Sequence, residues 1–309
     1  MSRRRSPAPR QSAGPSFCLP EHPVQGQHAM LECHSDERGV LLYIDGVESS
    51  YLDADPAHLE FEYMQQMTAA LVAARGQAPV KALHLGGGGC ALARAWDARF
   101  AGSTQVAVEY DSVLASSVRE WFDLPRAPRL RVRHGEARAV LSSGTSRFEA
   151  ITRDVFVGRD VPAHLRSAEF VSTVAARLEG DGIYLANLGS KPPLVEARRE
   201  VSTALEVWGR EQSLALISLP SLLAGRRYGN FVLAFAAGTD WSRTDLTRLL
   251  LKLPLPASFL TGSQLRDFAA GHFPYRDSSP WGEESGVESG ELSGAISGPA
   301  FGAASGATS

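Results

Sequence analysis

The stretch Lys81–Cys90, KALHLGGGGC, is the most informative part of the sequence. Val80–Leu85 is a short apolar run typical of a buried strand, four glycines follow it, and Ala91–Phe100 has the composition of a helix. A strand that runs through glycines into a helix is typical of the first turn of a nucleotide-binding βαβ unit. Glycine is required there because a side chain would keep the backbone away from a ligand and would penalise positive φ. The N-terminus of the following helix adds free N–H groups.

A second strand supports this interpretation. Gln105–Tyr110 contains Glu109, which comes 23 positions after Gly86. An acidic residue about 20 positions after the glycines is suited to bind the hydroxyl groups of a ribose. The two motifs together predict a nucleoside site. The alternative is an ordinary tight turn with an acid that caps a helix.

The chain then alternates between strand and helix patterns. Strand-like runs at 130–133, 149–152 and 182–188 follow the first two strands, and helix-like runs lie at 91–100, 112–122, 137–141, 168–178 and 195–208. Such alternation predicts an α/β fold with a doubly wound, mostly parallel sheet. Two later strands, at 214–218 and 230–235, have a short link, which predicts an antiparallel end to the sheet.

The flanking regions have a different composition. Residues 29–51 predict small antiparallel strands around the turn Asp45-Gly46, and a helix with Asp55 as its N-cap is expected from Pro56 to Arg75. Two short helices are expected at 244–251 and 264–271. The predicted organisation is a disordered tail (1–27), a β-hairpin region (28–55), a nucleoside-binding domain (56–238), C-terminal helices (239–275) and a second disordered tail (276–309).

Composition limits the classes of function. The 309 residues carry a net charge of -3, so no overall basic field predicts a nucleic-acid partner. No apolar run approaches the roughly 18 residues that span a bilayer, and no secretory signal follows Arg3–Arg5. The three cysteines are scattered and fit neither a disulfide framework nor a zinc site, which favours a reducing, cytoplasmic location.

Ligands of open α/β sheets bind beyond the carboxyl ends of the strands, so the residues at those ends form the candidate site. Acids at successive ends repel one another unless a ligand relieves the repulsion, and an adenosine with a positive sulfonium would do so. We assign Glu109 to the ribose, Glu136 to the adenine edge and Asp154 to the reacting end, whereas Asp111 and Glu136 are also suited to helix capping. The candidate cofactor-binding residues are Gly86, Gly87, Gly88, Glu109, Tyr110, Glu136, Ala137 and Asp154, and the candidate catalytic residue is Asp154.

Further polar residues are expected near the mouth of this site. Tyr63, His134 and His164 could reach it, and Asn187 follows the fifth strand. Arg153, Arg159 and Asp160 are expected in the loop where an acceptor would approach, and residues 226–228 either border the acceptor pocket or form a solvated turn. His84 is expected in the core. No cluster has the spacing of metal ligands, and no local motif suggests a Ser–His–Asp arrangement.

The motifs HLGGGGCALAR, VAVEYDSVL, HGEAR and EAITRDVF, in this order, resemble the spermidine synthase family. DGVESS and LEFEYMQQM resemble that family's small β-domain and the helix that leads into its sheet. The resemblance covers about residues 30–235. It implies a class I S-adenosylmethionine-type fold, S-adenosylmethionine or its decarboxylated form as cofactor, and a possible homodimer.

The chain departs from the family pattern at positions that matter chemically. Gly89 stands where the family has an acid that holds the aminopropyl group, and Cys90 replaces another glycine. Val157 stands where the family has the aspartate that acts as its catalytic base. Glu48 is aligned with a glutamine of the family's hairpin region.

These changes determine which reaction the sequence favours. A primary amine has a pKa of about 10.4 and needs a carboxylate to take its proton, whereas methyl transfer from a sulfonium requires mainly alignment. The resemblance therefore predicts a transferase diverged to methyl transfer, with a small amine or another nucleophile as acceptor. Aminopropyl transfer and non-catalytic nucleoside binding are the alternatives.

Overall fold

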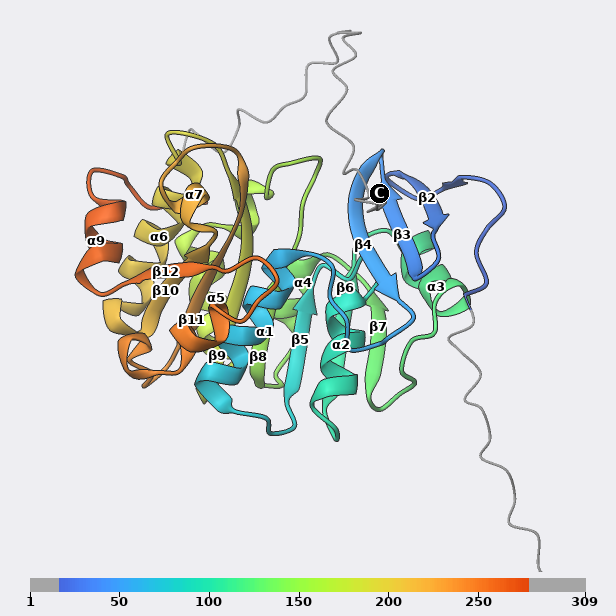
Figure 1. Ribbon diagram of the computed structural model, residues 1–309, viewed down its shortest axis with the longest axis horizontal. Coiled ribbons are helices and arrows are strands. Elements are labelled where there is room, and N and C mark those ends of the chain that lie inside the picture. Colours follow the sequence, from blue (N-terminus) through green and yellow to red (C-terminus); the bar gives the residue numbers. More distant parts are fainter. Residues whose placement is uncertain (1–16, 278–309) are drawn as a thin grey trace, which may run out of the picture.

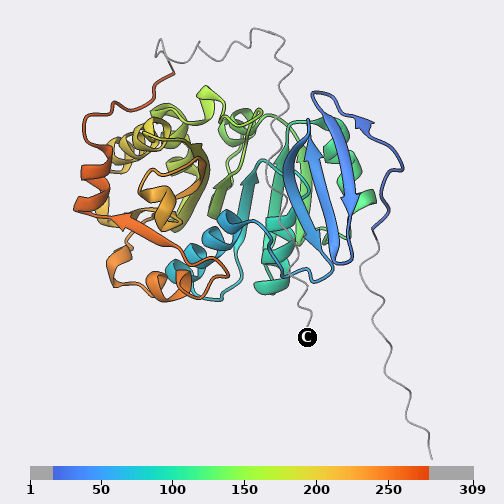
Figure 2. The ribbon, with the colours of Figure 1, turned by 45° about the horizontal axis from the view of Figure 1, so that its top comes forward.

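The computed structural model describes residues 17–277, which form two β-sheets and the helices that cover them (Figure 1). Of the two tails predicted at 1–27 and 276–309, residues 1–16 and 278–309 lie outside the described residues. No helix within residues 17–277 has the length and apolar character needed to cross a membrane. Figures 1 and 2 show the smaller sheet at the end of the molecule where α3 (Ser112–Trp121) lies.

The large sheet has eight strands in the order β12-β10-β11-β9-β8-β5-β6-β7. The bounds are β5 (Lys81–Leu85), β6 (Thr104–Glu109), β7 (Leu130–His134), β8 (Phe148–Arg153), β9 (Leu178–Ser190), β10 (Leu214–Ser218), β11 (Gly229–Ala236) and β12 (Ser258–Thr261). Strands β5 to β9 pair in parallel, whereas β11 is antiparallel to β9 and β10. The predicted doubly wound, mostly parallel sheet with an antiparallel end is confirmed.

The order of strands reverses direction at β5. From β5 the chain winds outward through β6 to β7, and then returns to β8 on the other side of β5. The loop after β5 therefore lies at a topological switch point, where the crossovers on the two sides diverge and leave a crevice. The glycine-rich stretch is placed at this crevice by strand order alone.

Each face of the sheet has its own apolar core. Helices α1 (Glu62–Arg75), α2 (Ala91–Arg99), α3 and α8 (Leu246–Leu250) pack on one face, and α4 (Ala137–Ser143), α5 (Ala168–Arg177), α6 (Val195–Trp208), α7 (Pro220–Leu223) and α9 (Ser263–Ala269) pack on the other. Three short 3₁₀ helices complete the described elements, at Ala163–Leu165, Glu211–Ser213 and Trp241–Arg243. In β5, Ala82 faces the first core while Leu83 and Leu85 face the second, as expected for a strand buried on both faces.

The smaller sheet is antiparallel and consists of β1 (Val24–Gln25), β2 (Met30–Ser35), β3 (Gly39–Ile44) and β4 (Val47–Asp53). Asp45 and Gly46 both have positive φ, 49° and 72°, and join β3 to β4 in the two-residue turn that their sequence predicts. Leu42 and Leu52 belong to the same core as α2. The sheet is thus attached to the large domain by apolar burial.

Two boundary predictions are wrong, and one strand was not predicted. The N-terminal tail was expected to reach residue 27, but residues 17–27 are placed because Phe17 and Leu19 pack against the core and Cys18 donates its N–H to the carbonyl of Trp121. The helix expected from Pro56 begins only at Glu62, because the Asp55 side chain accepts from the Ala57 N–H in a local turn. Strand β12 was not expected, because four residues at a sheet edge carry too short a pattern.

His84 is a core residue, as its position in a strand predicts. Its Nδ1 lies 3.0 Å from Thr152 Oγ1 and its Nε2 lies 2.9 Å from Gln105 Oε1. Burial lowers the pKa of His84 to about 4, so the ring is neutral in the folded protein.

This buried ring makes stability depend on pH. Because the pKa is lower in the folded than in the unfolded chain, the stabilisation is complete above about pH 6.5 and is lost as the pH falls toward 4. We expect the free energy of unfolding to fall by about 2 kcal/mol between pH 7 and pH 5 through His84 alone. Urea unfolding of the native protein and of His84→Gln at both pH values isolates this part, and equal pH dependence of the two proteins would contradict it.

Candidate functional site

The glycine loop connects the ends of two strands. Gly86 has a φ of 89°, and a Cβ on it would lie 2.0 Å from the carbonyl oxygen of Asp154, at the end of β8. Gly88 also has a positive φ, 47°. Only glycine permits this backbone path, so the loop runs directly against the β8 exit. This arrangement brings the predicted nucleoside loop and the predicted catalytic residue together.

Glu109 lies at the same loop. Its Oε2 accepts hydrogen bonds from the N–H groups of Gly88 at 2.8 Å and Gly87 at 3.2 Å, and its Oε1 accepts from the Asp111 N–H at 3.0 Å. The carboxylate thus bridges the ends of β5 and β6. Its position agrees with the predicted ribose contact, which stays a prediction.

The other predicted acids cap helices. Asp111 accepts from the N–H groups of Val113 and Leu114 at the start of α3, and Glu136 accepts from Arg138 and Ala139 at the start of α4. Burial acts to raise the pKa of Glu136, but these backbone hydrogen bonds hold it below its usual value. The capping alternative is therefore what the structure shows for both residues. An adenine contact by Glu136 stays a prediction.

Tyr110 and Ala137 flank these acids. The side chain of Ala137 is buried in the second core. Tyr110 is 54% exposed, and its ring stacks on His28 with 4.4 Å between the ring centres. The backbone N–H of His28 also donates to Asp111 at 2.9 Å, so the segment before β2 lies beside this end of the site. The sequence did not suggest His28.

Asp154 is held by two side chains from distant parts of the chain. Its Oδ2 accepts from the Tyr63 hydroxyl at 2.7 Å, and its Oδ1 accepts from Asn187 Nδ2 at 2.9 Å. Burial raises the pKa of Asp154 above its usual value, although both hydrogen bonds and the charge of Arg153 act in the opposite direction. Burial and the neighbouring carboxylate raise the pKa of Tyr63 far above its usual value, so Tyr63 remains a donor.

Asn187 has a free hydrogen-bond acceptor at this position. The residue is buried in β9, and its Oδ1 has no partner among the described residues. A buried acceptor without a partner is unfavourable, and a hydrogen-bond donor brought by a ligand would satisfy it. The site therefore suits a molecule that presents an N–H or O–H group next to Asp154.

The sequence predicted Arg153 in the acceptor loop, but the structure does not place it there. It is the last residue of β8, is 0% exposed, and forms an ion pair with Glu200 of α6 at 2.9 Å. It also donates to the carbonyls of Leu165 at 2.9 Å and Asn187 at 3.0 Å. Burial acts to lower the pKa of Arg153, but the Glu200 charge raises it above its usual value. Arg153 is therefore a buried residue that holds β8 and α6 together beside Asp154.

The two departures from the family pattern have different surroundings. Val157 is 71% exposed in the turn that it forms with Asp160. Gly89 is buried, its N–H donates to Ser50 Oγ at 2.9 Å, and a Cβ on it would lie 2.8 Å from Leu52 Cδ1 and 2.9 Å from Ser50 Cβ. Strand β4 thus fills the space where the family carries its acid.

Residues of β4 lie beside the glycine loop. A Cβ on Gly88 would lie 3.2 Å from Ser49 Oγ and 2.9 Å from Ser50 Oγ, whereas Glu48 is exposed. The alignment of Glu48 with the family glutamine stays a prediction.

The remaining candidates lie at the periphery. His134 is exposed, and His164 Nε2 lies 3.1 Å from Glu136 Oε1. Arg226 and Arg227 are exposed in the loop before β11. Residues 17–277 contain no group of three or more His, Cys, Asp or Glu residues that could hold a metal ion.

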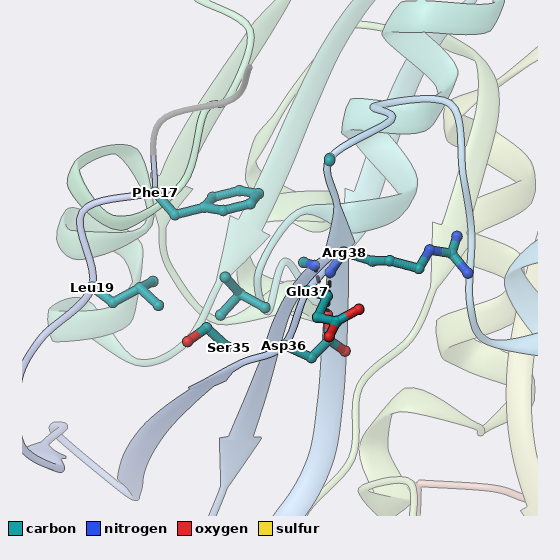
Figure 3. Close-up of a pocket in the computed structure, with 9 residues that line it drawn as sticks. Phe17, Leu19, Ser35, Asp36, Glu37 and Arg38 are labelled. Atoms are coloured by element: carbon teal, nitrogen blue, oxygen red, sulfur yellow. Dashed lines mark hydrogen bonds between the residues drawn. The ribbon is translucent and has the colours of Figure 1, made fainter. Parts of the chain in front are cut away.

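A hollow of about 330 Å³ lies elsewhere, beside the turn between β2 and β3 (Figure 3). Phe17 and Leu19 form one wall, and Asp36, Glu37 and Arg38 form another. Asp36 is engaged by the N–H groups of the turn and by the Tyr51 hydroxyl. This hollow contains none of the residues at the carboxyl ends of the large sheet's parallel strands, where we place the candidate site.

Known proteins similar to this chain include a probable spermidine synthase and a polyamine aminopropyltransferase. A probable spermidine synthase from Corynebacterium glutamicum has a structure similar over 89% of this chain and 100% of its own, with 32% identity and a TM-score of 0.76. The polyamine aminopropyltransferase of Vibrio vulnificus is 26% identical over 162 residues, so this chain spans about half the length, 53%, of that curated relative. No family model matches the chain.

A more distant structure supports the fold alone. The spermidine synthase from Thermotoga maritima is 16% identical, over 81% of this chain and 84% of its own, with a TM-score of 0.53. The glycine loop at the switch point, the acids at the strand ends and the small antiparallel sheet agree with the motif order noted in the sequence. Together with the similarity that spans all of the Corynebacterium protein, they place this chain in the spermidine synthase-like family of transferases.

Proposed function

We propose that this protein binds a sulfonium nucleoside, S-adenosylmethionine or its decarboxylated form, and transfers a group to a nucleophile held at Asp154. The contact between Gly86 and the Asp154 backbone supports this proposal most strongly, because it brings the glycine loop next to the partly buried Asp154 carboxyl group. The nucleoside would be held by Gly86, Gly87, Gly88 and Glu109. Its adenine base would lie beside Tyr110, Glu136 and Ala137. The bound sulfonium supplies an activated carbon for nucleophilic attack.

The residues around Asp154 are suited to orient the acceptor. Asn187 Oδ1 would accept a hydrogen bond from the attacking N–H or O–H group, and the Asp154 carboxylate would take its proton. Tyr63 and Asn187 each donate to one carboxylate oxygen, which fixes the plane of the carboxyl group. The raised pKa of Asp154 makes it a stronger base than an exposed aspartate.

We favour methyl transfer over aminopropyl transfer. The family acid that holds the aminopropyl group is replaced by Gly89, and the family base is replaced by the exposed Val157. In-line methyl transfer needs alignment of donor and acceptor and one base for the nucleophile's proton, which Asp154, Tyr63 and Asn187 can provide without the two missing acids. Aminopropyl transfer is the second candidate, because the relatives carry that activity in their names and Asp154 is retained.

Placing the family's acid at position 89 should not recreate the family's site for the aminopropyl group. We expect Gly89→Asp to destabilise the fold by at least roughly 1–3 kcal/mol, because its Cβ would overlap Leu52 and Ser50 and its carboxylate would be buried. Gly89→Ala is the control for the Cβ alone. Urea unfolding measures both variants, and a Gly89→Asp protein as stable as the original would show that β4 leaves room for the acid.

Ligand-dependent thermal unfolding tests the proposed function. The full chain would be heated with S-adenosylmethionine, its decarboxylated form and methylthioadenosine, each in excess. A ligand at 100 times its Kd stabilises by about 2.7 kcal/mol, which corresponds to roughly 5–10 °C for a domain of this size. Preference for S-adenosylmethionine supports methyl transfer, and preference for the decarboxylated form supports aminopropyl transfer. No shift with any of the three would refute the proposal.

Glu109→Gln provides a matched variant for this measurement. We expect it to weaken nucleoside binding by roughly 1.5–3 kcal/mol, through loss of a charged hydrogen bond to the ribose. The unliganded variant provides the baseline, because Glu109 also bonds the loop N–H groups. Unchanged affinity of all three nucleosides would mean that the ribose lies elsewhere.

A further inference from the structure

The mouth of the site carries positive charge that no described acid neutralises by an ion pair. Arg159 lies in the exposed loop after Asp154, and Arg226 and Arg227 lie in the exposed loop before β11. None of the three forms a salt bridge with another described residue. Asp160 and Glu196 are the nearby acids, and the Glu196 carboxylate already accepts from the Ser190 hydroxyl at 2.9 Å.

Both loops open on the edge that holds Asp154. Gly229 pairs with Ser190 and Asn230 pairs with Gly189, so the chain before β11 lies beside the carboxyl end of β9. The guanidinium of Arg159 lies over the ring of Tyr228, 5.6 Å from its centre. This contact joins the loop after β8 to the loop before β11.

Tyr228 connects this cation to the acceptor position. A Cβ on Gly189 would lie 2.6 Å from the Tyr228 hydroxyl, so the phenol rests directly on β9 at that residue. Gly189 is two positions after Asn187 and therefore on the same face of the strand, about 6–7 Å farther along. Arg159 thus contacts a ring whose hydroxyl rests on β9 two positions beyond Asn187, the residue with the unpaired oxygen.

We propose that the acceptor of this enzyme carries an anionic group, recognised by Arg159 on Tyr228, at the end opposite its nucleophile. A diamine would bring a second ammonium group toward these arginines, where like charges repel. A carboxylate or another planar anion would instead find a guanidinium able to donate two parallel hydrogen bonds. Tyr228 limits the directions in which that guanidinium can point. This inference rests on the proposed function, because Asp154 and Asn187 define the nucleophile's end.

Matched acceptor analogues test the proposal by binding alone. Calorimetric titrations of the full chain, with and without saturating methylthioadenosine, would compare ω-amino carboxylates with diamines of the same chain lengths. We expect at least one ω-amino carboxylate to bind about tenfold or more tightly than the corresponding diamine. Arg159→Gln should remove that preference. Arg210→Gln, which makes the same charge change before β10 at the opposite edge, should retain it.

Several outcomes would overturn the inference. These are tighter binding of the diamines, no binding of any ω-amino carboxylate, or an equal effect of the two arginine variants. Nucleoside binding is measured separately by thermal unfolding. If methylthioadenosine stabilises the protein while diamines bind best, only the anionic acceptor is refuted. If no nucleoside stabilises the protein, the proposed function fails, and the titrations without nucleoside still report on Arg159.

Discussion

Asp154→Asn is expected to lower the rate of group transfer by about 10²–10⁴-fold while the protein stays folded and binds nucleoside. Asparagine cannot take a proton from the acceptor. It also replaces one acceptor oxygen with an NH₂ group, so either the Tyr63 hydroxyl must turn to accept a hydrogen bond, or the NH₂ group faces Asn187 Nδ2 as donor against donor. The measurement is the initial rate of product formation at saturating donor, with methylthioadenosine affinity measured on the same preparation.

Tyr63→Phe is the matched control for this prediction. It keeps the ring, which stacks on Phe61 with 6.0 Å between ring centres, and removes only the hydroxyl donor to Asp154. We expect a smaller loss of rate, because the carboxylate remains and Asn187 still orients it. A rate within about tenfold of the original in Asp154→Asn would mean that Asp154 is not the base.

Glu200→Leu is expected to reduce the free energy of unfolding by about 3–5 kcal/mol. Arg153 is 0% exposed, so removal of Glu200 leaves a buried guanidinium charge without its ion-pair partner. Arg153→Met alone should also be costly, because it leaves the Glu200 carboxylate buried and the carbonyls of Leu165 and Asn187 without their donor.

The double variant Arg153→Met/Glu200→Leu distinguishes charge burial from simple loss of packing. Two apolar side chains of similar volume remove both buried charges, so we expect the double variant to be more stable than the sum of the single effects predicts. Urea unfolding of the four proteins gives the coupling energy. Strict additivity would contradict a buried charge pair between Arg153 and Glu200.

Local patterns were sufficient to predict most elements of the large domain. The turn Asp45-Gly46, the glycine loop after β5 and the helices from α2 to α6 follow from residues close together in the sequence, where periodicity and backbone preference act directly. The start of α1 and the short edge strand β12 were missed because their patterns are weak. Residues 17–27 are placed by contacts with α3 and its C-terminal end, which no local pattern can report.

The candidate site shows the same division. The mostly parallel sheet, the glycine loop after its first strand and the acids at the strand ends follow from the sequence alone. The meeting of Tyr63 and Asn187 at Asp154, the burial of Arg153 against Glu200 and the packing of β4 beside Gly89 were visible only in the folded structure. Strand and helix formation depend on nearby residues, whereas burial and side-chain partners depend on elements brought together by packing.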